Sequence, residues 1–177
     1  MLGEFMFAGF GGQGILLIGK ILAHAAMLEG AHVAWIPSYG PEMRGGTAYC
    51  TVVISNKPIG SPIIRKPQYL VAMNRPAFEK FAPLVKPNGI ILINTSLIPI
   101  SSGRSNVEEI KVPVIDIAKE LGNVKVANVV ALGALVKRSQ IVSFKILKEC
   151  IKMEFALKSA LIPINLKALD AGNQVGQ

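Results

Sequence analysis

Short apolar runs alternate with longer apolar segments along the chain, and glycine or proline separates most of them. One strand is predicted before the glycine cluster that begins at Gly9. Further strands, rich in β-branched and aromatic residues, are predicted for residues 32–36, 47–54, 69–73, 89–93 and 112–115. Helices are predicted for residues 15–28, 76–81, 116–121, 129–137, 144–155 and 161–171. This order favours a single α/β domain over residues 1–177, with a largely parallel sheet and helices on both faces.

Residues 38–58 interrupt the regular alternation of strands and helices. Residues 38–46 contain three glycines and a proline between two hydrophobic strands, so they are predicted to form a loop. Residues 55–58 have turn chemistry that could close a hairpin on Ile59. The sequence therefore predicts a β-hairpin excursion from the strand–helix–strand order.

Glycines and short polar residues set the predicted helix ends. Gly30 is expected to end the first helix, and the last helix is expected to end before Gly172. Asn128 and Ser143 precede apolar helical runs and are predicted to cap them, because short polar side chains accept hydrogen bonds from first-turn N–H groups. The first helix is apolar nearly all round, so we expect the sheet and other protein to cover it.

A glycine cluster joins the first strand to the first helix. Gly9, Gly11 and Gly14 satisfy G-x-G-x-x-G, which in a Rossmann-like unit allows a sharp turn and points N–H groups at a phosphate. A dinucleotide site also requires an acid at the end of the second strand. The nearest acid, Glu29, precedes that strand, so an ordinary NAD site is disfavoured. The turn could still receive an anion or pack against another backbone.

Polar residues collect at the predicted carboxyl edge of the sheet, where ligands bind in open α/β folds. Together with Arg44 and Gly45 from further along the glycine-rich loop they form the candidate binding set: Gly9, Gly11, Gly12, Gln13, Gly14, Ser38, Tyr39, Arg44, Gly45, Asn74 and Asn94. The residues at this edge offer amides, hydroxyls and backbone donors, without an obvious general base or nucleophile. We therefore expect no catalytic residue. The alternative is that the Asn and Ser side chains only cap helices and satisfy turns.

Composition indicates that the chain hides surface in an assembly. Of 177 residues, 51% are apolar and only 17% are charged, so a subunit interface is expected and at least a dimer is predicted. Lysines interrupt the apolar stretches well before the roughly 20 residues that a bilayer requires, which argues against a membrane span. Glu4 lies within the first strand and no basic leader precedes it, so a cytoplasmic protein is expected.

The charge pattern disfavours nucleic acid as a partner. The formal net charge is +8, but Lys and Arg are scattered in no run longer than a pair, and aromatic residues are not interleaved with them. The surface is either a solvated basic one or one that attracts an acidic partner or a polyphosphate cofactor. Cys50 and Cys150 are far apart, which argues against C-x-x-C ligand sets, and both are predicted to be inert core thiols. No metal site is expected.

Four stretches resemble the gamma subunit of 2-oxoacid:ferredoxin oxidoreductases, in order and in spacing. They are GFGGQG at residues 9–14, SYGPEMRGGT at 38–47, NVVALGA at 128–134 and NLKAL at 165–169. The resemblance extends from near the first residue to about Gly172. Phe10 resembles the 2-oxoglutarate branch, whereas the pyruvate branch more often has arginine there. Tyr49 stands where asparagine is common.

The resemblance implies a complex that converts a 2-oxoacid, with 2-oxoglutarate favoured over pyruvate, plus CoA to acyl-CoA and CO2 while it reduces ferredoxin. Thiamine diphosphate would be held by alpha and beta subunits, and iron–sulfur clusters by partner subunits or ferredoxin. A delta subunit is a further candidate partner. This chain would hold no cofactor alone, apart from a contact with coenzyme A, and would be inactive by itself.

Arg44 is the candidate for that contact, because its planar fork can grip a phosphate through two hydrogen bonds. The alternative is that Arg44 pairs with Glu42 within its own loop. Two other identities for the chain stay open. One is the corresponding subunit of the related indolepyruvate enzyme, and the other is a free-standing nucleotide-binding or redox-sensing domain.

Overall fold

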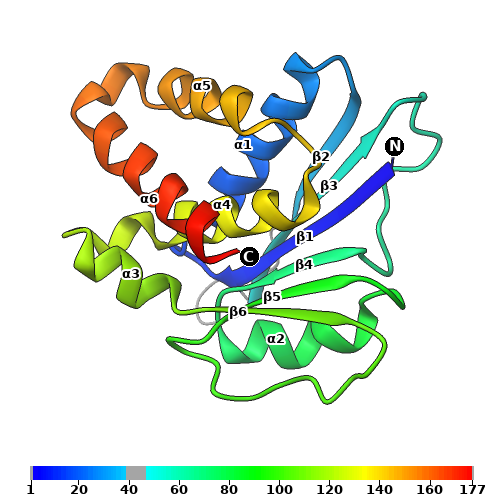
Figure 1. Ribbon diagram of the computed structural model, residues 1–177. Helices are drawn as coiled ribbons and strands as arrows, with labels where there is room; N and C mark the ends of the chain where they lie inside the picture. Colours follow the sequence, from blue (N-terminus) through cyan, green and yellow to red (C-terminus); the bar gives the residue numbers. More distant parts are fainter. Residues whose placement is uncertain (1, 39–46, 177) are drawn as a thin grey trace.

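Six β-strands form one mixed sheet in the computed structural model, which describes residues 2–38 and 47–176 (Figure 1). The strands are β1 Leu2–Phe10, β2 His32–Ser38, β3 Thr47–Ser55, β4 Tyr69–Ala72, β5 Ile90–Asn94 and β6 Glu108–Val112. Their order is β2-β3-β1-β4-β5-β6. Only β3 runs against the others, since it pairs antiparallel with β1 and β2 while β1, β4, β5 and β6 pair in parallel. The largely parallel sheet predicted from the sequence is confirmed.

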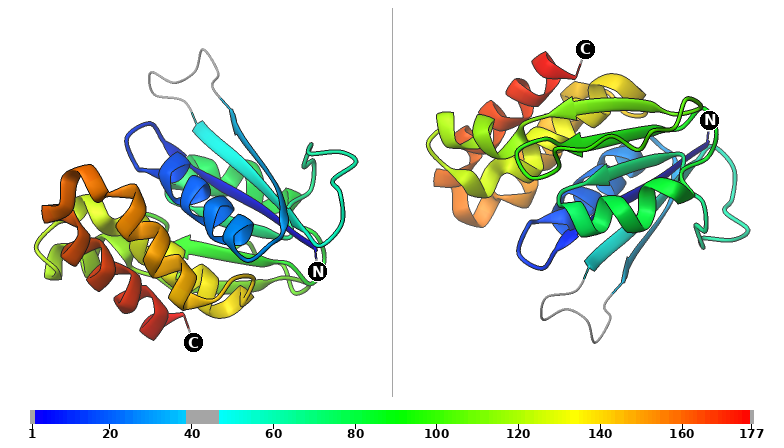
Figure 2. Two further views of the ribbon diagram at one scale, coloured as in Figure 1. Left: turned by 90° about the horizontal axis from the view of Figure 1, so that it is seen from above. Right: turned by 90° about the horizontal axis from the view of Figure 1, so that it is seen from below.

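Helices cover both faces of the sheet, as predicted (Figures 1 and 2). They are α1 Ile15–Leu28, α2 Arg75–Phe81, α3 Val114–Glu120, α4 Ala127–Ser139, α5 Phe144–Glu154 and α6 Ile162–Val175. Strand β1 buries Phe5 and Phe7 among residues of α1, α4 and α5, while Met6 and Ala8 face the side of α2. Burial on both faces explains why residues 5–8 of β1 form a continuous apolar run.

The excursion from the strand–helix–strand order is an antiparallel pair of β2 and β3. The residues that join them, 39–46, lie outside the described part of the chain. A hairpin onto Ile59 was the wrong expectation, because residues 56–68 contain no strand. Strand β3 already has neighbours on both sides, with Ser55 registered against both Leu2 and His32, so no edge is left for a further strand.

The last strand lies earlier than the sequence indicated. A strand over residues 112–115 and a helix over 116–121 were expected, but β6 is Glu108–Val112 and α3 is Val114–Glu120. The strand carries three charged residues, Glu108, Glu109 and Lys111. They occur because β6 is an edge strand, in which Ile110 and Val112 are buried while Lys111 is exposed. Pro113 separates the strand from α3.

Two predicted helix boundaries are wrong and two are correct. Gly30 follows the end of α1 with φ +82°, and the Ser143 hydroxyl caps α5 by accepting from the Ile146 N–H. Asn128 is not a cap, because α4 already begins at Ala127 after a 3₁₀ turn at Val124–Val126. Helix α6 does not end before Gly172 but runs through it to Val175.

Close contact between α4 and α6 explains Gly172. A Cβ atom at Gly172 would overlap the carbonyl oxygen of Val130, and one at Gly133 would overlap that of Leu169. These glycines are needed because the two helix backbones touch, and they do not stop the helix. None of the helices in the described residues combines the length and apolar character needed to cross a membrane.

Replacing Gly172 with alanine should destabilise the protein by at least about 1–3 kcal/mol, since the methyl group must push the two helices apart. Gly60→Ala is the matched control, because a Cβ there meets nothing within 4 Å. The control should stay within about 0.5 kcal/mol of the wild type in urea unfolding. Equal unfolding midpoints for the two variants would contradict this account of the helix contact.

Candidate functional site

A tight turn carries the chain from β1 into α1. The Gln13 N–H donates to the Phe10 carbonyl over 3.2 Å, and Gly12, the third residue of this turn, has φ +91°. Gly14 has φ +70° and immediately precedes α1. L-residues with side chains rarely adopt such values, so glycine is required at both positions. The predicted strand–turn–helix arrangement is confirmed.

The amide side chains expected to face a ligand bind one another or neighbouring backbone groups instead. Gln13 Oε1 accepts from the Phe10 N–H at 2.7 Å and from Asn74 Nδ2 at 3.0 Å. Gln13 Nε2 donates to the Met73 carbonyl at 3.4 Å, and Asn94 Nδ2 donates to the same oxygen at 2.9 Å. Asn74 Oδ1 caps α2 by accepting from the Ala77 N–H. These amides therefore fix the ends of β1, β4 and β5 relative to one another, and we call them the amide network (Gln13, Asn74 and Asn94).

Asn128 links α4 to the glycine turn across 114 residues of sequence. Its Nδ2 donates to the Gly14 carbonyl at 3.0 Å, while its Oδ1 accepts from the Val129 N–H. A Cβ atom at Gly14 would overlap the Asn128 side chain, so the two residues fit only as a pair. In the sequence, the signal for this role is a polar residue, Asn128, at the start of an otherwise apolar helical run.

A pocket of about 360 Å³ opens beside the glycine turn. Its lining comes from the turn, the end of β4, α3, the 3₁₀ turn and α4: Gly12, Gln13, Met73, Ile115, Val124, Lys125, Ala127 and Asn128. It lies beyond the carboxyl ends of the strands, where β1 leads to α1 on one face and β4 leads to α2 on the other. Such a change of face is where open α/β sheets bind ligands. We call it the edge pocket.

The edge pocket is suited to binding, because its wall is mainly apolar and carries one cation. Lys125 is the charged residue among its described lining, and the first turn of α1, whose N–H groups have no intrahelical acceptor, begins beside it. Asp, Glu, His and Cys are absent from that lining. The arrangement can therefore hold an anionic ligand with an apolar portion, but its described lining offers no carboxylate, imidazole or thiol.

The remaining residues of the predicted binding set do not all line the edge pocket. Gly9 and Gly11 belong to the strand end and the turn, and Ser38 ends β2, registered against Tyr49 of β3. Ser38 thus shares the carboxyl edge without lining the pocket. Tyr39, Arg44 and Gly45 lie outside the described residues. Lys125 was not expected from the sequence, because nothing local distinguishes it from the other lysines.

The two cysteines are buried, as predicted for core thiols. Cys50 lies beneath α1, where its Sγ donates weakly to the Ile15 carbonyl at 3.5 Å. Burial raises the pKa of the Cys50 thiol to about 12, against a small lowering by the Trp35 side chain. Burial also raises the pKa of Cys150, and the Glu149 and Glu29 carboxylates add to this effect.

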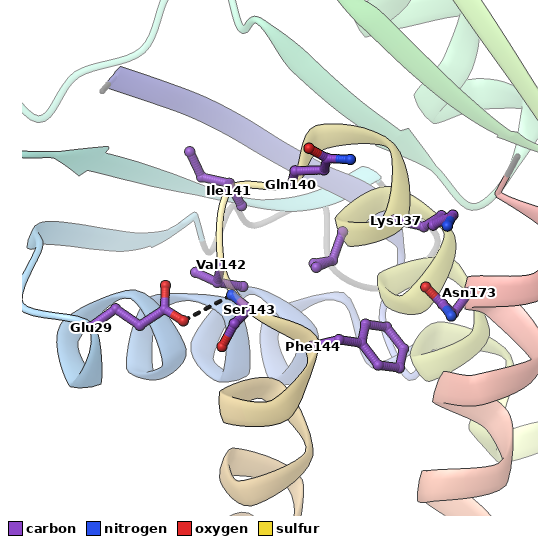
Figure 3. A pocket seen from close by; sticks show the side chains of 9 residues that line it. Glu29, Lys137, Gln140, Ile141, Val142, Ser143, Phe144 and Asn173 are labelled. Atoms are coloured by element: carbon purple, nitrogen blue, oxygen red, sulfur yellow. Dashed lines mark hydrogen bonds between the residues drawn. The ribbon is translucent and has the colours of Figure 1, made fainter.

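A larger hollow of about 530 Å³ lies where α1 and α4 end and α5 begins (Figure 3). There the Glu29 carboxylate accepts from the Ser143 N–H at 2.8 Å, as the dashed line in Figure 3 marks. An acid at this position stabilises the positive end of α5. The contact is structural, since it fastens the start of α5 to the end of α1.

The chain belongs to the pyruvate ferredoxin/flavodoxin oxidoreductase family, whose profile matches residues 4–175. It is 43% identical over 166 residues to the ketoisovalerate oxidoreductase subunit VorA of Methanothermobacter marburgensis, covering 93% of this chain but 34% of VorA. It is 38% identical over 151 residues to the 2-oxoglutarate synthase subunit KorC of Methanocaldococcus jannaschii, covering 84% of this chain and 81% of KorC. The chain thus spans about a third of the VorA relative and most of the KorC relative.

Two solved structures have the same fold. The keto/oxoacid ferredoxin oxidoreductase gamma subunit from Geobacter sulfurreducens is 31% identical, with a TM-score of 0.86 over 98% of both chains. The 2-oxoglutarate:ferredoxin oxidoreductase from Magnetococcus marinus, with 2-oxoglutarate, coenzyme A and succinyl-CoA bound, is 26% identical, with a TM-score of 0.91 over 99% of this chain and 31% of that chain. The resemblance to gamma subunits found in the sequence is confirmed.

We expect the buried thiol of Cys50 to make the free energy of unfolding decrease at alkaline pH. The unfolded thiol ionises near pH 9, whereas the folded one keeps its proton until about pH 12. Between these values the unfolded state binds fewer protons, so the free energy of unfolding decreases as pH rises, by up to about 1.4 kcal/mol per pH unit. Urea unfolding of wild type and Cys50→Ala between pH 8 and 10.5 measures the difference, and parallel slopes would contradict the buried-thiol assignment.

Proposed function

We propose that this chain is the gamma subunit of a 2-oxoacid:ferredoxin oxidoreductase. The complex converts a 2-oxoacid and CoA to acyl-CoA and CO2 and passes the electrons to ferredoxin. The observation that carries this proposal is the match to gamma-type relatives over nearly the whole chain, together with an edge pocket that has binding groups but no carboxylate, imidazole or thiol in its described lining. Alpha and beta subunits, and a delta subunit where one exists, are the proposed partners.

The substrate is proposed to be 2-oxoglutarate, and a branched-chain 2-oxoacid is the second candidate. KorC relatives and Phe10 favour the first, while the 43% identity to VorA favours the second. Initial rates of the assembled enzyme with 2-oxoglutarate and with ketoisovalerate separate these candidates directly.

Thiamine diphosphate and iron–sulfur clusters are assigned to the partner subunits or ferredoxin. For coenzyme A the residues of this chain offer a fit, because Lys125 and the first turn of α1 suit a phosphate and the apolar wall suits the less polar remainder. Coenzyme A would supply the thiol that accepts the acyl group. The role of this chain would be to bind and orient coenzyme A and to exclude water around it.

Removing a cation from the coenzyme A contact should raise the KM for coenzyme A and leave the KM for the 2-oxoacid nearly unchanged. Lys125→Ala and Arg44→Ala, each in the assembled enzyme, should lose one charge-assisted contact of about 1.5–3 kcal/mol, roughly a tenfold to hundredfold effect. Lys137→Ala is the control, because Lys137 lies in the hollow at the other end of α4. Unchanged KM values for both variants would refute the contact, and loss of assembly would place the residue in a subunit interface.

The isolated chain should not oxidise 2-oxoacids. Reconstitution of the alpha and beta subunits with and without this chain tests whether coenzyme A-dependent turnover requires it. Ferredoxin reduction by the purified single chain would disprove the proposed division of roles. Self-association to at least a dimer stays a prediction that light scattering can measure.

A further inference from the structure

The turn between α5 and α6 presents apolar side chains that the protein itself does not cover. We call residues 153–161 the α5–α6 corner. Leu157 is fully exposed at 101%, Met153 is 54% exposed and Leu161 is 36% exposed. The 3₁₀ turn Ala156–Leu161 has no buried residue. Figures 1 and 2 show this corner at the outer end of the helical layer, away from the sheet.

The corner is held in a defined shape although it contributes little to the core. Lys20 of α1 forms an ion pair with Glu154 at 2.9 Å, which fastens the end of α5. Asn165 Nδ2 donates to the Leu161 carbonyl at 2.8 Å, which secures the entry into α6. Lys158, with φ −132° and ψ 53°, breaks the helical path between them. A preorganised apolar projection of this kind loses little conformational entropy when a partner covers it.

The corner lies at the same edge of the molecule as the edge pocket. Its ion pair is with Lys20, in the second turn of α1, which begins at the glycine turn. Helix α6 contacts the 3₁₀ turn that carries Lys125 and the exposed Val124. A partner that covers the corner therefore reaches the rim of the edge pocket.

Two observations decide which partner fits. The chain matches only 34% of the VorA polypeptide and 31% of the Magnetococcus polypeptide, so in those relatives two thirds of a longer chain accompany this domain. The corner also carries one lysine, Lys158, that belongs to none of the ion pairs among the described residues, whereas its acid Glu154 is paired with Lys20 and the preceding Lys152 is paired with Glu149. Two copies placed corner to corner would bring like charges together, which disfavours self-association there.

We propose that the α5–α6 corner docks into an apolar pocket, rimmed by carboxylates, on the subunit that corresponds to the remaining two thirds of the VorA chain. Leu157 is the anchor of this contact, and Met153 and Leu161 complete it. The inference rests on the proposed function, because it requires that this chain assembles with such a subunit.

The test measures the dissociation constant between this full chain and the purified partner subunit. Leu157→Asp should weaken binding at least about tenfold, because it places a charge where an apolar anchor must be buried, next to partner carboxylates. Lys158→Glu should also weaken binding, and more strongly at low salt. Ile63→Asp is the control at a separate exposed apolar position, 71% exposed, and should bind as wild type. All three changes are at the surface, so the thermal midpoints of the isolated chains should match.

The outcomes separate the two proposals. If the wild-type chain does not bind the partner subunit, the proposed function fails. If the wild type binds and Leu157→Asp binds equally well, the corner is not the docking element, while the proposed function stands. If Leu157→Asp abolishes self-association of this chain and leaves partner binding intact, the corner is occupied by a second copy and the inference is overturned.

Discussion

The side-chain amide of Gln13 is the contact on which the carboxyl edge of the sheet depends. It accepts from Phe10 and Asn74 and donates to Met73, so one side chain joins the glycine turn to the end of β4. Met73 and Asn74 are buried, and an unpaired buried polar group costs about 1–3 kcal/mol. Gly9 fits closely against this amide: a Cβ there would lie 2.6 Å from Gln13 Oε1, so a larger residue would push Gln13 out of its hydrogen bonds. This network sets where α1 begins and therefore where the wall of the edge pocket stands.

Close helix packing fixes the opposite wall of that pocket. The glycine contacts between α4 and α6 let the two helices approach until their backbones touch, and Asn128 then reaches the Gly14 carbonyl from the first turn of α4. The position of Lys125, three residues earlier, follows from the position of Asn128. Two glycine-dependent contacts thus determine the geometry of the candidate site. The glycine turn with Gln13 positions one wall of the edge pocket, and the packing of α4 against α6 positions the other.

The local pattern of apolar residues was sufficient to predict the helices and strands that are uniformly buried. Helix α1 and strands β3 and β4 could be predicted from sequence because apolar runs and flanking glycines mark them. Strand β6 could not, since its charged residues reflect an edge position that only the folded sheet defines. Gly172 was misjudged for a related reason, because a glycine that permits helix contact and one that ends a helix look alike in sequence. In the site, Gln13, Asn74 and Asn94 were located at the correct edge, but the Gln13–Asn74 hydrogen bond and the Met73 carbonyl shared by Gln13 and Asn94 depend on side-chain directions that no spacing encodes. Lys125 could not be predicted as a site residue, because only the packing of α4 brings it to the pocket beside the glycine turn.

The edge pocket and the α5–α6 corner share one edge of the molecule, and this arrangement constrains how a ligand can be used. A pocket whose described lining lacks a carboxylate, an imidazole and a thiol needs reacting groups from elsewhere, and the nearest source is whatever covers the exposed apolar residues beside it. Phe10 and Val124, both partly exposed at this edge, would be covered by the same partner. A ligand held by the α1 terminus and Lys125 would then lie between two polypeptides. Binding of the ligand and assembly of the subunits would consequently be thermodynamically linked, each strengthening the other by the same factor.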